Sequence, residues 1–476
     1  MKLYEKLADS LRMQIKQGFY LAGDKLPSVR QLSTQHNVSI STVQEAYRRL
    51  EMENLVEARP KSGYFATPGI AAYKLPEISR PPQRPLDVSQ WEEVLNLLLA
   101  KETLGSIQLQ HAMPSMDVIS IKPLLKKLTD LTRQQAALSL PYGDIRGDII
   151  LREQLGRLAF NSGCLLHPDD IVVTSGCQEA LSVCLRAVSK AGDIVAIESP
   201  SFYGSMQAIK TADLKVIEIP THPETGISLE ALELALDQWP IKAIQVTPTC
   251  NNPMGYNMPT KNKERLYKLA QSYDIAIIED DIYGDIAYQF PRPKTVKSFD
   301  NDGRVLLCSS FSKSIAPGLR VGWIAPGRYR DEVTHIKYVS SSMCPTLPQL
   351  AIADFIKTGG YDRHIRRLRL EYRQARDHFI KTLTKHFPEE TKISFPEGGY
   401  LLWVELPEEV DTIKLAIETR NGGVNIAAGS LFSATGKYRN CIRLNFNEQN
   451  AKVREDGVRK LAYFINAHIT NSKNKK

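Results

Sequence analysis

The sequence has no apolar run of 18 or more residues, so we expect no membrane span. Its first residues, Met1 to Lys6, lack the apolar core of a secretory signal and lead straight into a charged, helix-like pattern. The seven cysteines are scattered, odd in number and form no CxxC pair, which argues against a disulfide framework and against a zinc site. These absences predict a cytoplasmic protein that binds no metal.

The composition is that of a globular protein, with 42% hydrophobic and 24% charged residues. A chain of 476 residues is too long for one core, so two or three domains are expected. The net charge of +8 permits a nucleic-acid partner without establishing one. Residues 1–68 hold ten basic and seven acidic residues, a surplus of three, so part of this charge belongs to the N-terminal segment.

Residues 1–68 read as a small domain with three helices and two strands. The first helix carries an apolar residue every fourth position from Leu3 to Ile15. Ser28 with Gln31, and Ser41 with Gln44, have the spacing of capping boxes that open the second and third helices. Two short strands, 55–59 and 64–67, follow around a turn and complete the pattern of a winged helix-turn-helix.

In a winged helix-turn-helix the third helix enters the major groove of DNA. Four polar residues near its start are candidates for base or phosphate contacts: Ser39, Ser41, Thr42 and Gln44. Four basic residues are candidates for phosphate contacts: Arg30, Arg48, Arg59 and Lys61. The alternative is a helical appendage whose charges are simply solvated. Segments 26–32, 38–43 and 59–65 resemble the DNA-binding domain of GntR-type bacterial regulators, which implies that the partner is double-stranded operator DNA.

Residues 69–89 contain four prolines and are predicted to form an extended spacer. From residue 90 to residue 476, helical stretches alternate with short apolar, β-branched runs. This alternation predicts an α/β fold, with a mostly parallel sheet covered by helices on both faces and a smaller α+β subdomain at the C-terminus. The expected domains are therefore 1–68, a spacer at 69–89, and 90–476.

Several motifs in the larger domain suit a cofactor with an aldehyde, a ring and a phosphate. Lys313 lies among small and apolar residues, where a buried amine can form a Schiff base. Asp280 ends an apolar strand and can pair with a pyridine nitrogen, with Tyr283 near the ring hydroxyl. Asn252 can donate to a ring oxygen. Each motif alone also has an ordinary explanation, such as a solvated lysine, a capping acid or a turn.

Further residues extend this pattern. Phosphate-binding candidates are Ser175, Gly176 and Cys177 at a helix start, then Ser310, Ser312 and Arg320. Phe202 is a candidate for stacking on a ring, although core packing is the usual role of such an aromatic. Arg443, in an apolar strand, needs either a ligand carboxylate or an internal partner.

Taken together, these segments resemble fold-type I pyridoxal phosphate enzymes of the aspartate aminotransferase family over about residues 90 to 470. The resemblance implies that Lys313 holds pyridoxal 5'-phosphate, that Asp280 contacts the pyridine nitrogen and that Arg443 binds an amino-acid carboxylate. Tyr142, in a segment similar to the family's Tyr-Gly-x-x-x-Gly element, is implied to reach a phosphate in the partner subunit. Ile145 stands where this element commonly has a proline.

The whole chain looks like a MocR-type transcription regulator, which joins a GntR-like domain to an aminotransferase-like domain. This resemblance implies a homodimer that regulates transcription and senses an amino compound, an amino acid or the B6 vitamer. The alternative is a working aminotransferase with a DNA-binding appendage, because every residue needed for a first half-reaction is present. The sequence leaves open whether transamination turns over.

Overall fold

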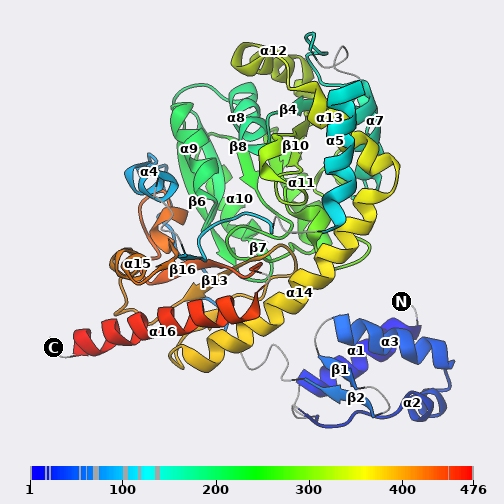
Figure 1. Ribbon diagram of the computed structural model, residues 1–476. Coiled ribbons are helices and arrows are strands. Elements are labelled where there is room, and N and C mark those ends of the chain that lie inside the picture. Colours follow the sequence, from blue (N-terminus) through cyan, green and yellow to red (C-terminus); the bar gives the residue numbers. More distant parts are fainter. Residues whose placement is uncertain are drawn as a thin grey trace. The chain divides into compact units, whose positions relative to one another are not determined.

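The computed structural model describes residues 3–16, 19–20, 23–52, 55–59, 62–67, 74–89, 91–99, 105–115, 119–134, 140–448 and 450–473. The chain divides into two compact units, Met1–Lys74 and Leu75–Lys476 (Figure 1). None of the described helices combines the length and apolar composition that crossing a bilayer requires. The described residues also hold no cluster of three or more His, Cys, Asp or Glu side chains arranged for a metal ion.

The smaller unit, here called the head, has the predicted three helices and antiparallel hairpin. Its elements are α1 (Leu3–Lys16), α2 (Val29–His36), α3 (Ile40–Met52), β1 (Val56–Arg59) and β2 (Gly63–Ala66). The predicted apolar face of α3 is fully buried: Val43, Ala46, Tyr47 and Leu50 are each 0% exposed. Tyr47 also stacks on Tyr64 of the hairpin, which fixes the wing against α3.

The predicted start of α3 is wrong: the helix begins two residues earlier than the capping box at Ser41 indicates. Ser28 does cap α2, since its hydroxyl accepts from Gln31 N at 3.2 Å. The helix α3, however, begins at Ile40, and Ser39 Oγ accepts from Thr42 N at 3.1 Å. Ser39 thus takes the capping position that the sequence pattern assigned to Ser41, because the helix already begins at Ile40.

Residues 75–89 are extended and lie against the larger unit, here called the body. Leu86 forms a β-bridge with Val216, Thr221 N donates to Ser79 Oγ, and Ser89 Oγ donates to Ala434 O. The structure therefore places this proline-containing stretch in the body from Leu75 onward. The domain boundaries at residues 68 and 89 stay predictions.

The body is built around an eight-stranded sheet in the order β4-β11-β10-β9-β8-β5-β6-β7. Its strands are β4 (Val172–Thr174), β5 (Ile194–Ser199), β6 (Lys215–His222), β7 (Gly226–Ile227), β8 (Ile241–Val246), β9 (Ala276–Asp280), β10 (Val305–Ser310) and β11 (Gly322–Ala325). The pairs from β10 to β6 are parallel, and β11 and β7 run antiparallel to their neighbours. The predicted mostly parallel sheet is confirmed.

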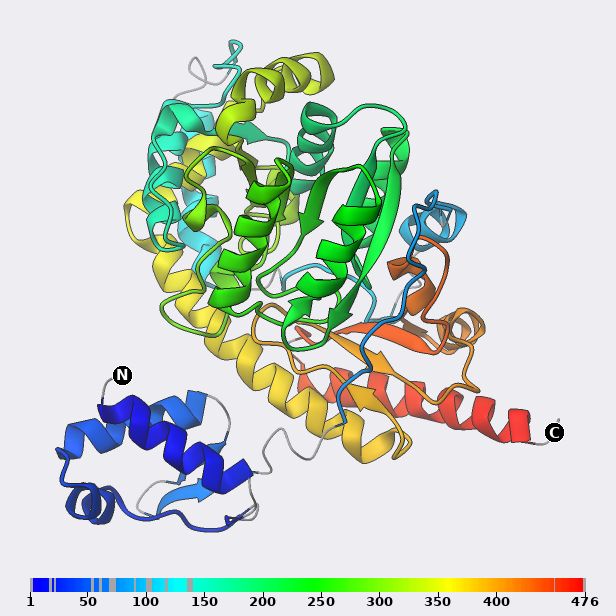
Figure 2. The ribbon, with the colours of Figure 1, turned by 180° about the vertical axis from the view of Figure 1, so that it is seen from behind.

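Helices cover both faces of this sheet (Figures 1 and 2). Alternate residues of the central strands belong to two separate apolar cores: one contains Ile244 and Ile277, the other contains Ala243 and Ile278. This alternation shows that each strand is buried on both sides. The helices of the body are α4 (Trp91–Leu99), α5 (Lys122–Gln134), α7 (Ile149–Phe160), α8 (Cys177–Val188), α9 (Tyr203–Thr211), α10 (Leu229–Gln238), α11 (Thr260–Ser272), α12 (Arg330–Ser341), α13 (Thr346–Lys357), α14 (Gly360–His386), α15 (Thr412–Asn421) and α16 (Ala451–Lys473).

A smaller antiparallel sheet, in the order β12-β13-β16-β15, forms the predicted α+β subdomain. Its strands are β12 (Lys392–Ile393), β13 (Leu401–Glu405), β15 (Ala427–Ala428) and β16 (Cys441–Asn445). The long helix α14 leads from the large sheet into this subdomain and packs beside α16 (Figures 1 and 2). Strand β3 (Ile107–Gln108) pairs with β14 (Val424–Asn425), so residues near 110 lie next to the C-terminal strands.

Candidate functional site

Lys313 lies in the turn that follows β10, at the carboxyl edge of the large sheet. Its Nζ donates to the carbonyl oxygen of Ala112 at 2.5 Å. Burial, together with the nearby Arg443 cation, lowers the pKa of Lys313 to about 8, against the opposing effect of Asp280. An amine with this pKa has a substantial neutral, nucleophilic fraction near neutral pH.

Asp280 ends β9, and its carboxylate is 4% exposed. Burial raises the pKa of Asp280 to about 6, while hydrogen bonds from Cys177 and from Ile282 N oppose that rise. Cys177 Sγ lies 3.4 Å from Asp280 Oδ1, and Ile282 N lies 3.1 Å from the same oxygen. The carboxylate is thus held in place and still ionised at pH 7, ready for a cationic partner.

Replacement of Asp280 by asparagine is expected to stabilise the cofactor-free chain. The folded-state pKa lies above the ordinary value of 3.8, so the folded state binds more protons and loses stability as the pH rises from about 4 to 6. The amide oxygen of Asn can still accept from Cys177 and Ile282. We expect Asp280→Asn to raise the free energy of unfolding at pH 8 by about 1–3 kcal/mol, with no gain below about pH 4.

Urea unfolding of the cofactor-free chain between pH 4 and pH 8 measures this difference. The control is Asp331→Asn, because the side chain of Asp331 is 95% exposed. A gain for Asp280→Asn that is the same at every pH would show that the buried charge is not its origin.

Arg443 extends from β16 and is fully buried, at 0% exposure. Its Nη1 donates to Asn252 Oδ1 at 3.2 Å, and its Nη2 donates to Gln110 O at 2.5 Å. The guanidinium also lies over the rings of Phe432 and Tyr203, 5.0 and 5.8 Å from their centroids. No carboxylate side chain pairs with it among the described residues, so an anionic ligand would complete its charge balance.

Two buried polar atoms of the site are candidates for a hydrogen bond to a ligand. The Tyr283 hydroxyl and Arg443 Nε form no hydrogen bond of normal geometry within the described part of the chain. The Tyr283 ring lies against Tyr400, with 5.8 Å between the ring centroids. Since Arg443 occupies Asn252 Oδ1, the amide nitrogen of Asn252 is the atom available to donate to a ligand oxygen.

The start of α8 has no side-chain cap. Gly176 precedes the helix with φ +96°. Arg320, itself at φ +51°, donates from Nη2 to Ser175 O at 2.5 Å. A Cβ on Gly176 would lie 2.6 Å from Arg320 Nη2, so a glycine is needed for this guanidinium to approach.

The remaining predicted residues are placed as follows. Ser312 N donates to Ser310 Oγ at 3.3 Å in the Lys313 turn, and both serines are buried. The Phe202 ring is half-buried next to Tyr203, with 4.7 Å between centroids. Tyr142 is 89% exposed within its own chain. Its role toward a partner subunit stays a prediction.

Two parts of the site had no motif in the sequence. The carbonyl groups of Gln110 and Ala112 contact Arg443 and Lys313 across more than 200 residues of chain, a relation that no local pattern reveals. Glu198, buried, accepts from Thr247 N at 2.9 Å, from Asn251 Nδ2 at 3.1 Å and from the Tyr256 hydroxyl. It therefore ties down both ends of the loop that carries Asn252.

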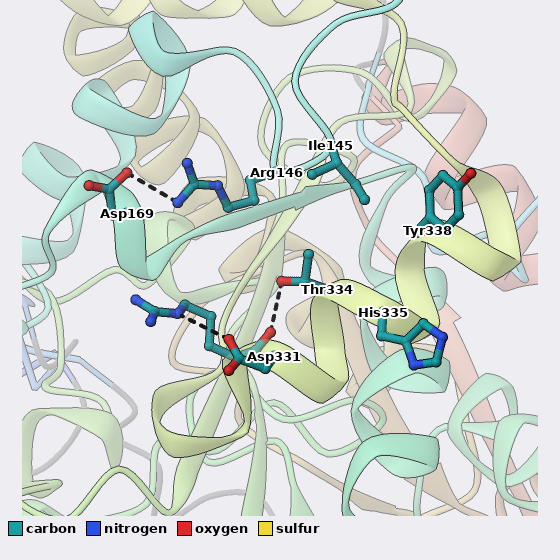
Figure 3. Close-up of a pocket in the computed structure, with 8 residues that line it drawn as sticks. Ile145, Arg146, Asp169, Asp331, Thr334, His335 and Tyr338 are labelled. Carbon is teal, nitrogen blue, oxygen red and sulfur yellow. Dashed lines mark hydrogen bonds and ion pairs between the residues drawn. The ribbon is translucent and has the colours of Figure 1, made fainter.

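A separate groove of about 590 Å³ lies elsewhere on the body (Figure 3). Its lining residues are Ile145, Arg146, Asp169, Arg330, Asp331, Thr334, His335 and Tyr338. The charges pair with one another: Arg146 lies 3.2 Å from Asp169, and Arg330 lies 3.7 Å from Asp331. None of the predicted cofactor residues lines this groove, so its chemistry is not that of the Lys313 site.

The predicted DNA-binding residues of the head differ in their solvent exposure. Ser41, Gln44, Arg30, Arg48 and Arg59 are exposed and Thr42 is half-buried, whereas Lys61 lies outside the described residues. Ser39 is occupied as the cap of α3. Arg48 is held by Glu45 through two hydrogen bonds of 2.9 and 2.8 Å, and Arg59 pairs with Glu57. Ile40, an apolar residue, is 50% exposed at the first position of α3.

Both units match known protein families. Residues 114–456 match the family described as aminotransferase class I and II, and residues 3–65 match the family described as bacterial regulatory proteins, gntR family. The HTH-type transcriptional regulator YjiR of Escherichia coli (strain K12) is 50% identical over 445 residues, covering 94% of this chain and 95% of its own. The HTH-type transcriptional regulator YdcR of the same organism is 33% identical and covers 98% of this chain and 100% of its own.

A solved structure of Pyrococcus horikoshii kynurenine aminotransferase, in complex with PMP, is similar to the body. It is 31% identical with a TM-score of 0.73, and covers 80% of this chain and 95% of its own. The fold and site thus define a regulator with an aminotransferase-like body. The chain belongs to the aminotransferase class I and II family, joined to a gntR-family head, and is an HTH-type transcriptional regulator.

Proposed function

We propose that the body binds pyridoxal 5'-phosphate at Lys313, and that an amino compound at this site alters how the head binds operator DNA. The observation that carries the proposal is the convergence of Lys313, Asp280 and Arg443. A lysine of lowered pKa has two charged neighbours, a buried carboxylate and a buried guanidinium that pairs with no carboxylate among the described residues. The family assignment supports the same cofactor, since class I and II aminotransferases depend on it.

The predicted site residues have functional groups that suit the parts of this cofactor. When bound, pyridoxal phosphate supplies an aldehyde that condenses with an amine and a ring that withdraws electrons. Lys313 provides the amine, and Asp280 holds a proton on the ring nitrogen. Tyr283 and the Asn252 amide nitrogen would hold the ring oxygen, and Phe202 would pack against the ring. The phosphate would be held by Ser175, Gly176 and Cys177 at the start of α8, together with Ser310, Ser312 and Arg320 from the segment around Lys313.

The effector binds through Arg443 when it carries a carboxylate. A carboxylate offers two oxygens to the guanidinium, whereas Gln110 O and Asn252 Oδ1 are single neutral acceptors. A carboxylate therefore competes favourably for one of these donors. The chain acts as a homodimer in the cytoplasm, with Tyr142 of the partner subunit near the phosphate; its exposure of 89% within one chain suits such a role.

Coupling to DNA requires that the ligand bind two states of the protein with different affinity. The experiment is a titration of the cofactor-loaded protein with a panel of amines and amino acids, read by the absorbance of the bound cofactor and by binding to a selected operator duplex. We expect compounds that change the absorbance to change the operator affinity as well. Spectral changes without any change in DNA affinity would reject the sensing role.

The head gives a separate prediction about salt dependence. Arg48 is a phosphate contact that Glu45 partly neutralises in the free protein. We expect Arg48→Ala to weaken operator binding and lower the slope of log affinity against log salt by about 1. Glu45→Gln should do the reverse and tighten binding, because it releases the guanidinium. Equal slopes for Arg48→Ala and the wild type would remove Arg48 from the phosphate contacts.

A further inference from the structure

The start of α14 contacts the turn that carries Lys313. His364, which is 1% exposed, joins two segments that are far apart in sequence. Its Nε2 lies 2.7 Å from Ser314 O, and its Nδ1 lies 2.7 Å from Ser120 Oγ, in the short helix Ile119–Ile121. A carbonyl oxygen only accepts, so Nε2 carries the proton and the Ser120 hydroxyl donates to Nδ1. Burial lowers the pKa of His364, which keeps the ring neutral in this arrangement.

Tyr361, one helical turn before His364, contacts the same serine. Its hydroxyl donates to Asp285 Oδ2 at 2.6 Å and lies 3.2 Å from Ser314 Oγ. The ring packs edge-on against Phe311, with 5.6 Å between centroids. Ser314 directly follows Lys313 and is therefore held at both its carbonyl and its hydroxyl by residues of α14.

The network continues to the second predicted cofactor residue. Arg292 donates from Nη1 to Asp285 at 2.6 Å and from Nη2 to both carboxylate oxygens of Asp281. The side chains of Arg292 and Asp281 are 7% and 3% exposed, so this pairing is shielded from water. Asp281 directly follows Asp280. One buried network thus ends on the immediate neighbours of both Lys313 and Asp280.

We propose that His364 is a positioning residue for Lys313: by fixing the carbonyl of Ser314, it sets the direction in which the lysine side chain leaves its turn. The proposal rests on the proposed function, because it needs Lys313 to take up the cofactor. A shift of the reacting amine by about 1 Å is enough to slow a reaction greatly. His364 is not itself a catalytic residue, since its hydrogen bonds go to Ser314 and Ser120 and its ring packs against Phe355.

The experiment compares the wild type with His364→Ala, His364→Gln and Tyr361→Phe in the full chain. The control is His378→Ala, four turns further along α14, where the ring pairs with Glu455 of α16. Cofactor-free protein is mixed with pyridoxal 5'-phosphate, and the growth of absorbance gives the rate and the affinity. The pH midpoint of that absorbance and the thermal midpoint of the cofactor-free protein are measured in parallel.

We expect His364→Ala to slow cofactor uptake and weaken affinity by about tenfold each, and to move the pH midpoint. His364→Gln, whose amide N–H can donate to Ser314 O, should recover most of the rate. Tyr361→Phe should produce a smaller change in the same direction, and it removes only a hydroxyl if His364→Ala fails to fold. His378→Ala should match the wild type in every readout.

Two results would overturn the proposal. One is a rate and a pH midpoint for His364→Ala and Tyr361→Phe equal to those of the wild type, whatever their thermal midpoints. The other is an equal loss in His364→Gln and His364→Ala, which would assign the ring a role in folding alone. A wild-type protein that takes up no cofactor would instead reject the proposed function on which this inference rests.

Discussion

The Lys313→Ala protein is expected to lose the visible absorbance of the bound cofactor and the response of DNA binding to amino compounds. No other residue among those described combines an amine of lowered pKa with Asp280 and Arg443 as charged neighbours. Removal of this amine leaves Asp280, Tyr283 and the start of α8 to bind the cofactor without a covalent bond. We expect the affinity for pyridoxal 5'-phosphate to fall by a factor of at least 100.

Two lysines of α11 serve as comparisons. Lys261→Ala changes an exposed lysine and should leave the spectrum and the DNA response unchanged. Lys263 is a second buried lysine whose pKa is lowered by burial. It is held by Thr249 Oγ1 at 2.6 Å and by Lys294 O at 2.8 Å, so it is a structural cation. An unchanged spectrum in Lys313→Ala would assign the cofactor to another lysine and contradict the site described above.

Arg443→Gln is expected to abolish the response to amino acids while sparing the response to simple amines. The glutamine amide can still donate to Gln110 O or Asn252 Oδ1, but it carries no charge to bind a carboxylate. A buried charge-assisted pair contributes several kcal/mol when one partner is lost, so we expect amino acids to bind at least 100-fold more weakly. Spectral titration with matched pairs, such as an amino acid and its decarboxylated amine, measures the difference.

A control for that variant is Arg439→Gln, just before β16, where the arginine is exposed and pairs with Asp411. Its ligand affinities should equal those of the wild type. If Arg443→Gln weakens amines and amino acids by the same factor, the guanidinium supports the fold of the pocket and does not bind a carboxylate.

The main elements of the fold could be predicted because they follow from local patterns. The apolar stripe of α3 and the β-branched strands of the large sheet each mark one element, and the structure confirms them. The exact start of α3 could not be predicted, because Ser39 and Ser41 are both good capping residues. Which hydroxyl reaches an N–H depends on the turn that precedes the helix.

The candidate site was predicted where its residues follow strands in fixed motifs, as Asp280 follows β9 and Lys313 follows β10. The sequence did not predict the contacts that segments far apart in the chain make with the site. The carbonyl groups of Gln110 and Ala112, just after β3, approach Arg443 and Lys313 from a distant part of the chain, and backbone atoms leave no signature in a sequence. His364 was missed for a related reason, since a single histidine on the buried face of a long helix usually indicates core packing.

The central claim is that ligand chemistry at Lys313 controls DNA binding by the head. The most direct measurement is the affinity of wild-type and Lys313→Ala proteins for one selected operator duplex, with and without pyridoxal 5'-phosphate and an amino compound that changes the wild-type spectrum. We predict that these ligands change the wild-type affinity at least fivefold and leave that of Lys313→Ala unchanged. Equal affinities of the wild type under all conditions, or an equal response in both proteins, would contradict the account.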